Sequence, residues 1–203
     1  MQVDRPKLLG DPEARAARLL QLQEEHIAPL TAFVQSLRIE AGPEAAIPYF
    51  DPWDGGVAAE VLFLLEAPGP KAVSSSFISR NNPDETAKNF FELTVAAEIP
   101  RKKTIAWNAV PWYIGTGIKI RAATTSDLEA GLLPLPRLLE LLPNLRVVVF
   151  VGKKAEKARK QVSNLKPTLT LFTCPHPSPM FVNRLPGNRE KILAVLREVR
   201  KLV

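Results

Sequence analysis

From residue 60 onward, short apolar runs alternate with segments of helical periodicity, and this alternation restricts the possible folds more than any other feature. Four runs have the length and composition of buried strands: VLFLL (61–65), TIAW (104–107), RVVVFV (146–151) and TLTLFT (168–173). Helical patterns are found at 84–97, 126–142, 153–162 and 187–202. Strands that alternate with helices form parallel sheets covered on both faces. We therefore expect an α/β protein, a three-layer α/β/α sandwich with a central four-stranded parallel sheet.

The first 45 residues are predicted to form a helical segment of their own. Apolar side chains recur at helical spacing over 12–39, with Asp11 as the N-cap and Pro12 at the first helical position. Pro29 could kink or split this helix, and Gly42–Pro43 ends the pattern. We divide the chain into this segment, 1–45, and a larger domain, 46–203. Ser126 is the expected cap of the helix at 126–142.

Composition excludes several classes of protein. The chain has 203 residues, of which 46% are hydrophobic and 24% are charged, as is usual for a globular domain. The lone Cys174 excludes a disulfide framework, a Cys-ligated zinc finger and a Cys-ligated iron–sulfur cluster. No apolar run approaches the ~20 residues that span a bilayer, and the start of the chain lacks a signal-peptide core. We expect a cytoplasmic protein that does not bind membranes and holds no metal or cofactor.

The charge is distributed unevenly along the chain. Residues 1–100 hold 8 basic and 15 acidic residues, whereas residues 101–203 hold 19 basic and 6 acidic residues. The whole chain has a net charge of +6 and a pI near 9.6. An excess of positive charge in one half favours a polyanionic partner such as nucleic acid.

Chemically useful residues follow the predicted strands. Glu66 follows the first strand, Asn108 the second, Gly152-Lys153 the third, and the segment with His176 the fourth. In open α/β sheets, ligands bind beyond the carboxyl ends of the strands, so these side chains are expected at one rim. A carboxylate can orient water, an amide offers a donor and an acceptor to a planar ring, and a histidine can stabilise a leaving anion.

At these positions the sequence resembles the uracil-DNA glycosylase superfamily. LEAPG (65–69) resembles the first motif of the superfamily, WNAV (107–110) its central strand, and HPSP (176–179) its second motif. VGKKA (151–155) resembles the segment that precedes the second motif, and the order and spacing agree from about residue 60 to the end. The resemblance implies that 46–203 is a catalytic domain that hydrolyses uracil from single- or double-stranded DNA, as a monomer and without a cofactor.

The resemblance also implies a role for each motif residue. Glu66 would position the water that attacks C1′ of the deoxyribose, and His176 would donate to uracil O2 as the base leaves as an anion. Asn108 would hydrogen-bond the uracil edge, and Phe77 would stack on the flipped base. The expected DNA contacts are the backbone at Gly69, the side chains of Lys153, Ser178 and Arg184, and Met180 as the residue inserted into the duplex.

Two departures from the family pattern leave the substrate open. The most familiar branch has an aspartate at the position of Ala67 and a thymine-excluding tyrosine at the position of Gly69. One alternative is therefore a glycosylase for other deaminated bases, such as hypoxanthine or xanthine. Another is a non-catalytic protein that binds abasic or damaged DNA. A small-molecule α/β hydrolase is disfavoured because the chain has no G-x-S-x-G elbow.

Overall fold

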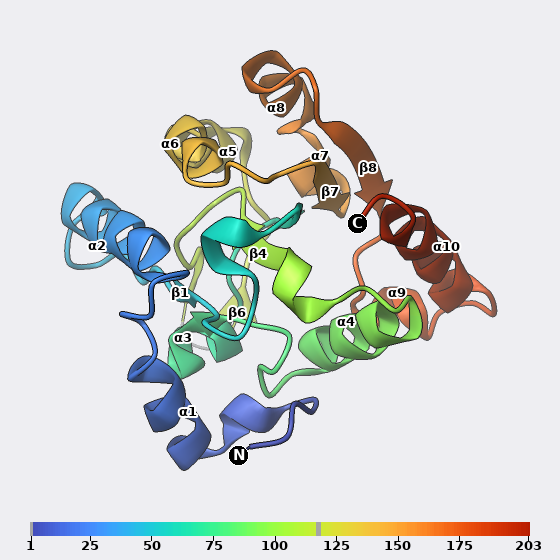
Figure 1. Ribbon diagram of the computed structural model, residues 1–203, viewed down its shortest axis with the longest axis horizontal. Coiled ribbons are helices and arrows are strands. Elements are labelled where there is room, and N and C mark those ends of the chain that lie inside the picture. Colours follow the sequence, from blue (N-terminus) through green and yellow to red (C-terminus); the bar gives the residue numbers. More distant parts are fainter. Residues whose placement is uncertain (1, 117–118) are drawn as a thin grey trace.

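A four-stranded parallel sheet forms the centre of the computed structural model, which describes residues 2–116 and 119–203 (Figure 1). The strand order is β4 (Thr104–Asn108), β2 (Val61–Leu65), β7 (Val147–Val151) and β8 (Thr170–Cys174). Leu65 pairs with Asn108, and Val151 pairs with Cys174, so the carboxyl ends of neighbouring strands lie at one edge. The predicted strands and the predicted sheet are confirmed.

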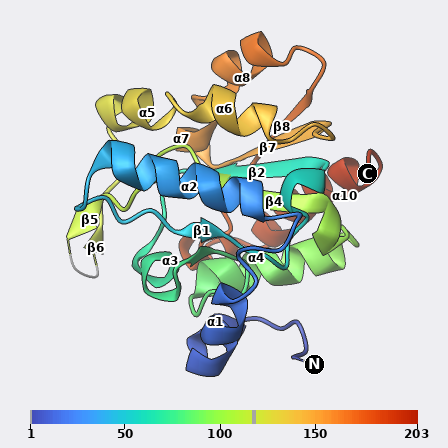
Figure 2. The same ribbon diagram turned by 60° about the vertical axis from the view of Figure 1, so that its left-hand side comes forward.

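Helices cover both faces of this sheet, as a continuous apolar run in each inner strand requires. In Figure 2, α5 (Thr125–Gly131), α6 (Leu135–Glu140) and α8 (Arg159–Leu165) lie above the sheet, and α4 (Glu85–Ala96) lies below it. The final helix, α10 (Asn188–Arg200), contacts both α4 and β8. The three-layer α/β/α arrangement is therefore the one predicted. The shorter helices are α3 (Pro70–Ser75), α7 (Lys153–Glu156) and α9 (Pro179–Val182), and the 3-10 turns are η1 (Leu8–Gly10), η2 (Gly56–Ala58) and η3 (Arg101–Lys103).

Aromatic pairs show which helix covers which face. Phe63 of β2 packs edge to face against Phe90 of α4, with ring centroids 4.9 Å apart. Trp107 of β4 contacts Phe33 of α2 (Ala28–Ala41) at 5.9 Å and stacks on Phe50 at 4.2 Å. Because adjacent strand residues point to opposite faces, Ala106 and Asn108 of β4 lie on the α4 side, away from Trp107.

Several predicted helices are broken into two. The pattern over 12–39 forms α1 (Pro12–Leu19) and α2, with Pro29 in the first turn of α2, where a missing N–H leaves no hydrogen bond unmade. The pattern over 126–142 forms α5 and α6, and Pro134 occupies the position directly before α6. The basic segment at 153–162 forms α7 and the start of α8. Asp11 caps α1 through the amide of Glu13 and Gly42 ends α2, both as predicted.

The cap predicted at Ser126 is wrong. Thr124 caps α5 instead, in a reciprocal capping box with Asp127. Thr124 and Asp127 therefore fix the start of α5.

Two small sheets were not predicted, because two-residue strands are too short to show a periodicity. The strand β1 (Tyr49–Phe50) runs parallel to β3 (Phe77–Ile78), and β5 (Gly115–Thr116) forms a hairpin with β6 (Lys119–Ile120). The first pair brings the segment before β2 next to the segment before α4.

The N-terminal residues pack on the rest of the molecule. Phe33, Val34 and Leu37 of α2 belong to the same hydrophobic core as the sheet. The helix α1 lies at the lower margin of the view in Figure 2, on the side of α4. In the described part of the chain, no helix has both the length and the apolar character needed to cross a membrane.

Candidate active site

A cavity of about 480 Å³ opens at the carboxyl edge of the sheet. Its size is within the range of small-molecule sites. The wall is formed by the loop after β2, the end of β4, the segment 78–90, the end of the β5–β6 hairpin and the loop after β8. Glu66, Asn108 and His176 all line it, so the three residues singled out from separate strand ends lie around one cavity.

Glu66 is held by a backbone amide from the segment just before α5. Its Oε1 accepts a hydrogen bond of 2.7 Å from the amide of Ala123. The carbonyl of the same Ala123 accepts a hydrogen bond of 2.5 Å from Nζ of Lys154. The backbone of Ala123 therefore joins Glu66 to Lys154, and its amide fixes one carboxylate oxygen of Glu66. Among the described residues, Oε2 has no hydrogen-bond or ion-pair partner.

Asn108 has a buried side-chain amide with an unused hydrogen-bond donor. It ends β4, and the backbone beyond it is fixed by hydrogen bonds from the amides of Ala109 and Val110 to the carbonyls of Leu65 and Glu66. Within the described chain, its buried Nδ2 has no hydrogen-bond partner. A buried donor without a partner is unfavourable, so this arrangement indicates a ligand that accepts a hydrogen bond there.

His176 lies in a loop that a hydrogen bond from α4 holds in place. Pro177, the next residue, accepts a hydrogen bond of 2.9 Å through its carbonyl from Nδ2 of Asn89 in α4. Burial lowers the pKa of His176, while the negative charges of Glu66 and Asp84 act in the opposite direction. The neutral imidazole is therefore the main form at pH 7, with one ring N–H that can donate.

The stacking role predicted for Phe77 is not supported by its position. Phe77 is fully buried in a separate small cluster with Leu9 and Leu22, and it does not line the cavity. Its neighbour Ile78 lines the cavity instead, because successive residues of a strand point to opposite sides. Phe90 of α4 is the phenylalanine in the cavity wall, and its ring is supported edge to face by Phe63.

The predicted DNA contacts lie in different surroundings, and one of the five lines the cavity. Gly69 lines the cavity just before α3. The hydroxyl of Ser178 caps α9 by accepting from the amide of Phe181, so this oxygen already has one partner. Lys153 and Arg184 are exposed, and so is Met180, at 86%, like other large apolar side chains such as Leu20 and Ile39.

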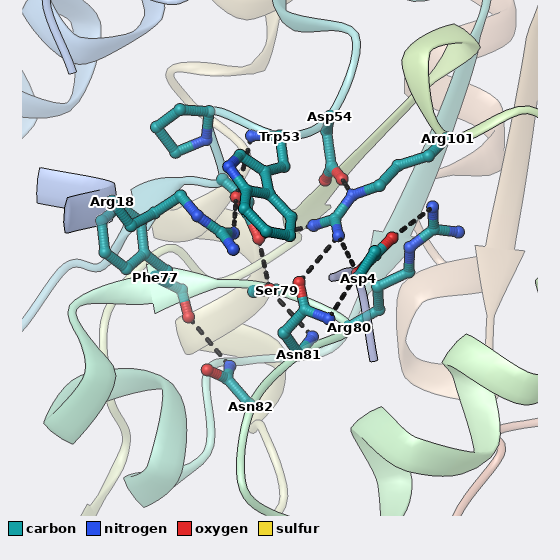
Figure 3. Close-up of polar contacts among 12 residues, drawn as sticks. Asp4, Arg18, Trp53, Asp54, Phe77, Ser79, Arg80, Asn81, Asn82 and Arg101 are labelled. Atoms are coloured by element: carbon teal, nitrogen blue, oxygen red, sulfur yellow. Dashed lines mark hydrogen bonds and ion pairs between the residues drawn. The ribbon is translucent and has the colours of Figure 1, made fainter. Parts of the chain in front are cut away.

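A network of largely buried charges adjoins the cavity wall (Figure 3). Arg18 donates to Asp51 at 2.5 Å, although both side chains are almost completely buried, and it lies 3.6 Å from the centre of the Trp53 ring. Ser79, which lines the cavity, donates to the other oxygen of Asp51. The members of this buried charge network are Asp4, Arg18, Asp51, Asp54, Ser79, Arg80, Asn81 and Arg101.

Arg101 pairs with all three aspartates of this network, Asp4, Asp51 and Asp54. Its guanidinium donates to Asp51 at 2.7 Å and to Asp54 at 2.8 Å. Although burial acts in the opposite direction, Arg101 and Arg18 hold the pKa of Asp51 below its usual value. Burial raises the pKa of Asp54 to about 6. The network thus ties the N-terminal residues to the cavity wall at Ser79 and Arg80.

Sequence reasoning missed three contributors to the site. Asp84 and Phe90 come from a helix that carries no recognised motif, and Ala123 acts only through its backbone. The signal available for Asp84 was its place as an acidic N-cap directly before a helical pattern. The described residues contain no group of three or more His, Cys, Asp or Glu side chains that could hold a metal ion.

The chain is similar to one protein family and to solved structures. The model of the uracil DNA glycosylase superfamily matches residues 52–200. No curated protein sequence matches the chain. Among solved structures, the SMUG2 protein of Pedobacter heparinus is similar in fold, with a TM-score of 0.55 and 14% identity over 88% of this chain and 85% of that one. A candidate uracil DNA glycosylase from Methanosarcina acetivorans aligns at 17% identity with a TM-score of 0.48, over 71% of this chain and 94% of its own.

Proposed function

The chain belongs to the uracil DNA glycosylase superfamily and is a DNA glycosylase, and we propose that the base it removes is uracil. In this proposal it is monofunctional: water hydrolyses the N-glycosidic bond and an abasic site remains. The observation that carries the proposal is the convergence of Glu66, Asn108 and His176 on one cavity. A carboxylate, an unpartnered amide and a neutral imidazole are the groups that such a reaction uses.

Base reading is assigned to Asn108 and Phe90. The target base must leave the duplex stack to reach the cavity. The free Nδ2 of Asn108 then donates to a carbonyl of the base, and the amide oxygen accepts from the ring N–H. Phe90 offers the flat apolar surface that the sequence analysis assigned to Phe77. Uracil presents alternating carbonyl and N–H groups, so it suits a side-chain amide.

Bond cleavage is assigned to His176 and Glu66. As the bond between C1′ and the base nitrogen breaks, its electron pair leaves with the base, and the sugar passes through an oxocarbenium-like state. The imidazole N–H of His176 stabilises the departing anion. Glu66 uses its free carboxylate oxygen to orient water toward C1′ and to accept its proton. Losing one such preorganised donor typically lowers the rate by ~10²–10³.

DNA binding is assigned to the surface around the cavity mouth. Lys153 and Arg184 are exposed and carry charges suited to phosphates, and Met180 protrudes where an apolar side chain could enter the base stack. Such a wedge offsets part of the unfavourable free energy of unstacking.

The test is a strand-cleavage assay on oligonucleotides that contain one uracil, single-stranded and in duplex, with alkali to reveal abasic sites. We expect cleavage by the parent protein, loss with His176→Ala, and a parent-like rate with His26→Ala. His26 is the matched control because it is the other histidine of the chain, and its ring contacts the carbonyl of Pro52 at 2.8 Å. Equal rates for the parent and His176→Ala would overturn the proposed role of His176.

Comparing substrates that differ in the target base identifies the base that the protein removes. Duplexes with uracil, thymine, hypoxanthine or xanthine are compared under single-turnover conditions. We expect uracil to be cleaved fastest, and Asn108→Asp to reduce that preference because an amide donor becomes an acceptor. Faster release of hypoxanthine or xanthine would replace the proposed substrate. Tight binding of abasic DNA with no cleavage of any base would favour the non-catalytic reading.

A further inference from the structure

The start of α4 supplies a second carboxylate to the cavity. Asp84, Thr86, Ala87 and Phe90 all line the cavity wall. Asp84 is the N-cap of α4, and its Oδ1 accepts a hydrogen bond of 2.9 Å from the amide of Ala87. In the part of the chain that the structure describes, its other oxygen has neither a hydrogen bond nor an ion pair. The cap therefore fixes the carboxylate and leaves one oxygen available.

Glu66 has the same arrangement on another wall of the cavity. One of its oxygens is held by the backbone amide of Ala123, and the other is available. The cavity thus contains two carboxylates that come from different elements, each oriented by one peptide N–H. The cationic side chains in the cavity wall, which belong to Lys71, Arg80 and Arg121, form no ion pair with either carboxylate in the described chain.

Asp84 and His176 belong to elements that are linked to each other. Asn89, five residues after Asp84 in the same helix, donates to the carbonyl of Pro177, the residue after His176. A shift of α4 would therefore shift the histidine loop. The negative charge of Asp84 also acts on His176, where it opposes the effect of burial on the pKa of the imidazole. Capping of α4 accounts for one oxygen of Asp84 but not for the place of its side chain in the wall of the cavity that His176 also lines.

We propose that Asp84 is a second functional carboxylate of the cavity, which stabilises the positive charge that develops on the deoxyribose during base release. The inference rests on the proposed function, because only a reaction with a cationic sugar needs such a group. In this arrangement Glu66 and Asp84 divide two tasks. Glu66 orients the attacking water, and Asp84 provides a fixed negative charge near the sugar and His176. No bond to Asp84 forms or breaks.

The decisive variant is Asp84→Asn, because it removes the charge and keeps the cap. Asparagine is as good an N-cap as aspartate, so the helix should start at the same place. We expect a single-turnover rate on uracil-containing DNA lowered by roughly 100-fold, the lower end of the ~10²–10³ range for losing one preorganised electrostatic group. The thermal midpoint should stay close to that of the parent. Asp84→Ser, another good cap without charge, should give the same result if the asparagine variant folds poorly.

Asp11→Asn is the matched control. Asp11 is also an N-cap aspartate with one oxygen on a backbone amide at 2.9 Å, but it starts α1 and does not line the cavity. We expect a parent-like rate for this variant. If Asp84→Asn and Asp11→Asn both keep the parent rate, Asp84 is only a helix cap and the inference is wrong.

A second readout does not depend on turnover. The imidazole signals of His176 can be titrated by NMR in the parent and in Asp84→Asn, with His26→Gln to assign the only other histidine. We expect the pKa of His176 to fall further in Asp84→Asn, because a negative charge near the imidazole has been removed. An unchanged titration would contradict the proximity on which the inference depends. An inactive parent would instead refute the proposed function itself.

Discussion

Gly152 packs directly against His176. A Cβ built on Gly152 would lie 3.3 Å from the Cβ of His176, closer than most real Cβ contacts. The amide of Gly152 also donates to the carbonyl of Cys174 at 2.8 Å, so the loops after β7 and β8 are joined at this point. With a φ of +89°, Gly152 adopts a backbone conformation that L-residues rarely take. The glycine thus sets where the histidine loop can lie.

Gly152→Ala should therefore impair both stability and base release. We expect a loss of about 1–3 kcal/mol in the free energy of unfolding from the strained backbone, and a lower single-turnover rate from displacement of His176. Gly42→Ala is the control, because Gly42 has a similar backbone conformation, with φ +84° and ψ 172°, and nothing within 4 Å of its Cβ position. It should lose stability but keep its rate. Equal rates for the two variants would show that Gly152 does not position His176.

Phe90→Leu should mainly lower the rate of base release, whereas Phe77→Leu should mainly lower stability. Phe90 lines the cavity, and base–aromatic stacking contributes about 1–3 kcal/mol per base, so Phe90→Leu should lower the rate on uracil by roughly 5- to 150-fold. Phe77 is fully buried away from the cavity, so Phe77→Leu should lower the free energy of unfolding by about 1–3 kcal/mol with a nearly unchanged rate. Urea denaturation and single-turnover assays separate the two. A larger rate effect at Phe77 would restore the original assignment.

The error at Phe77 shows what the sequence could not provide. Long apolar strands and their topology are encoded locally, and a parallel sheet brings their carboxyl ends together, so Glu66, Asn108 and His176 could be grouped from spacing alone. The side to which Phe77 points depends on contacts with Leu9 and Leu22, far away in the sequence. No local pattern in a two-residue strand reports such contacts.

The hydrogen bonds and ion pairs that support the site could not be predicted from the sequence either. The hydrogen bond from Ala123 to Glu66 uses a backbone amide, which has no sequence signature. The pairing of Arg18 with Asp51 joins positions that are 33 residues apart, and each of these residues alone reads as an ordinary surface charge. Such partners become visible only when the tertiary structure places them together.

Asp51→Asn tests whether the buried charge network holds the fold together. Asp51 is buried and pairs with both Arg18 and Arg101, so removing its charge leaves the buried Arg18 without an ion-pair partner in the described chain, while Arg101 keeps Asp4 and Asp54. We expect a loss of about 3–5 kcal/mol in the free energy of unfolding, as is typical when one partner of a buried ion pair is removed. Glu40→Gln, which breaks an exposed pair with Arg137, should change stability little. Similar urea midpoints for both variants would contradict this prediction.

Stability should fall in acid partly because of His176. Burial lowers the pKa of this histidine in the native state, whereas an unfolded histidine titrates near 6.5. As the pH falls from 6.5 to the lower native pKa, the unfolded chain binds more protons than the native protein, so the free energy of unfolding decreases. His176→Gln should therefore lose less stability than the parent between pH 7 and pH 5. A loss as large as that of the parent would mean that His176 does not contribute.

Met180→Ala should separate duplex from single-stranded substrates. Met180 is 86% exposed and lies four residues after His176, so its side chain can enter a base stack beside the cavity. Unstacking costs a few kcal/mol in duplex DNA and less in a single strand, so the wedge should matter mainly for the duplex. We expect Met180→Ala to slow duplex cleavage at least tenfold more than single-strand cleavage, since ~1.4 kcal/mol corresponds to tenfold. Leu133→Ala, which truncates a 77% exposed leucine between α5 and α6, should leave both rates unchanged. Equal slowing on both substrates would assign Met180 to loop packing.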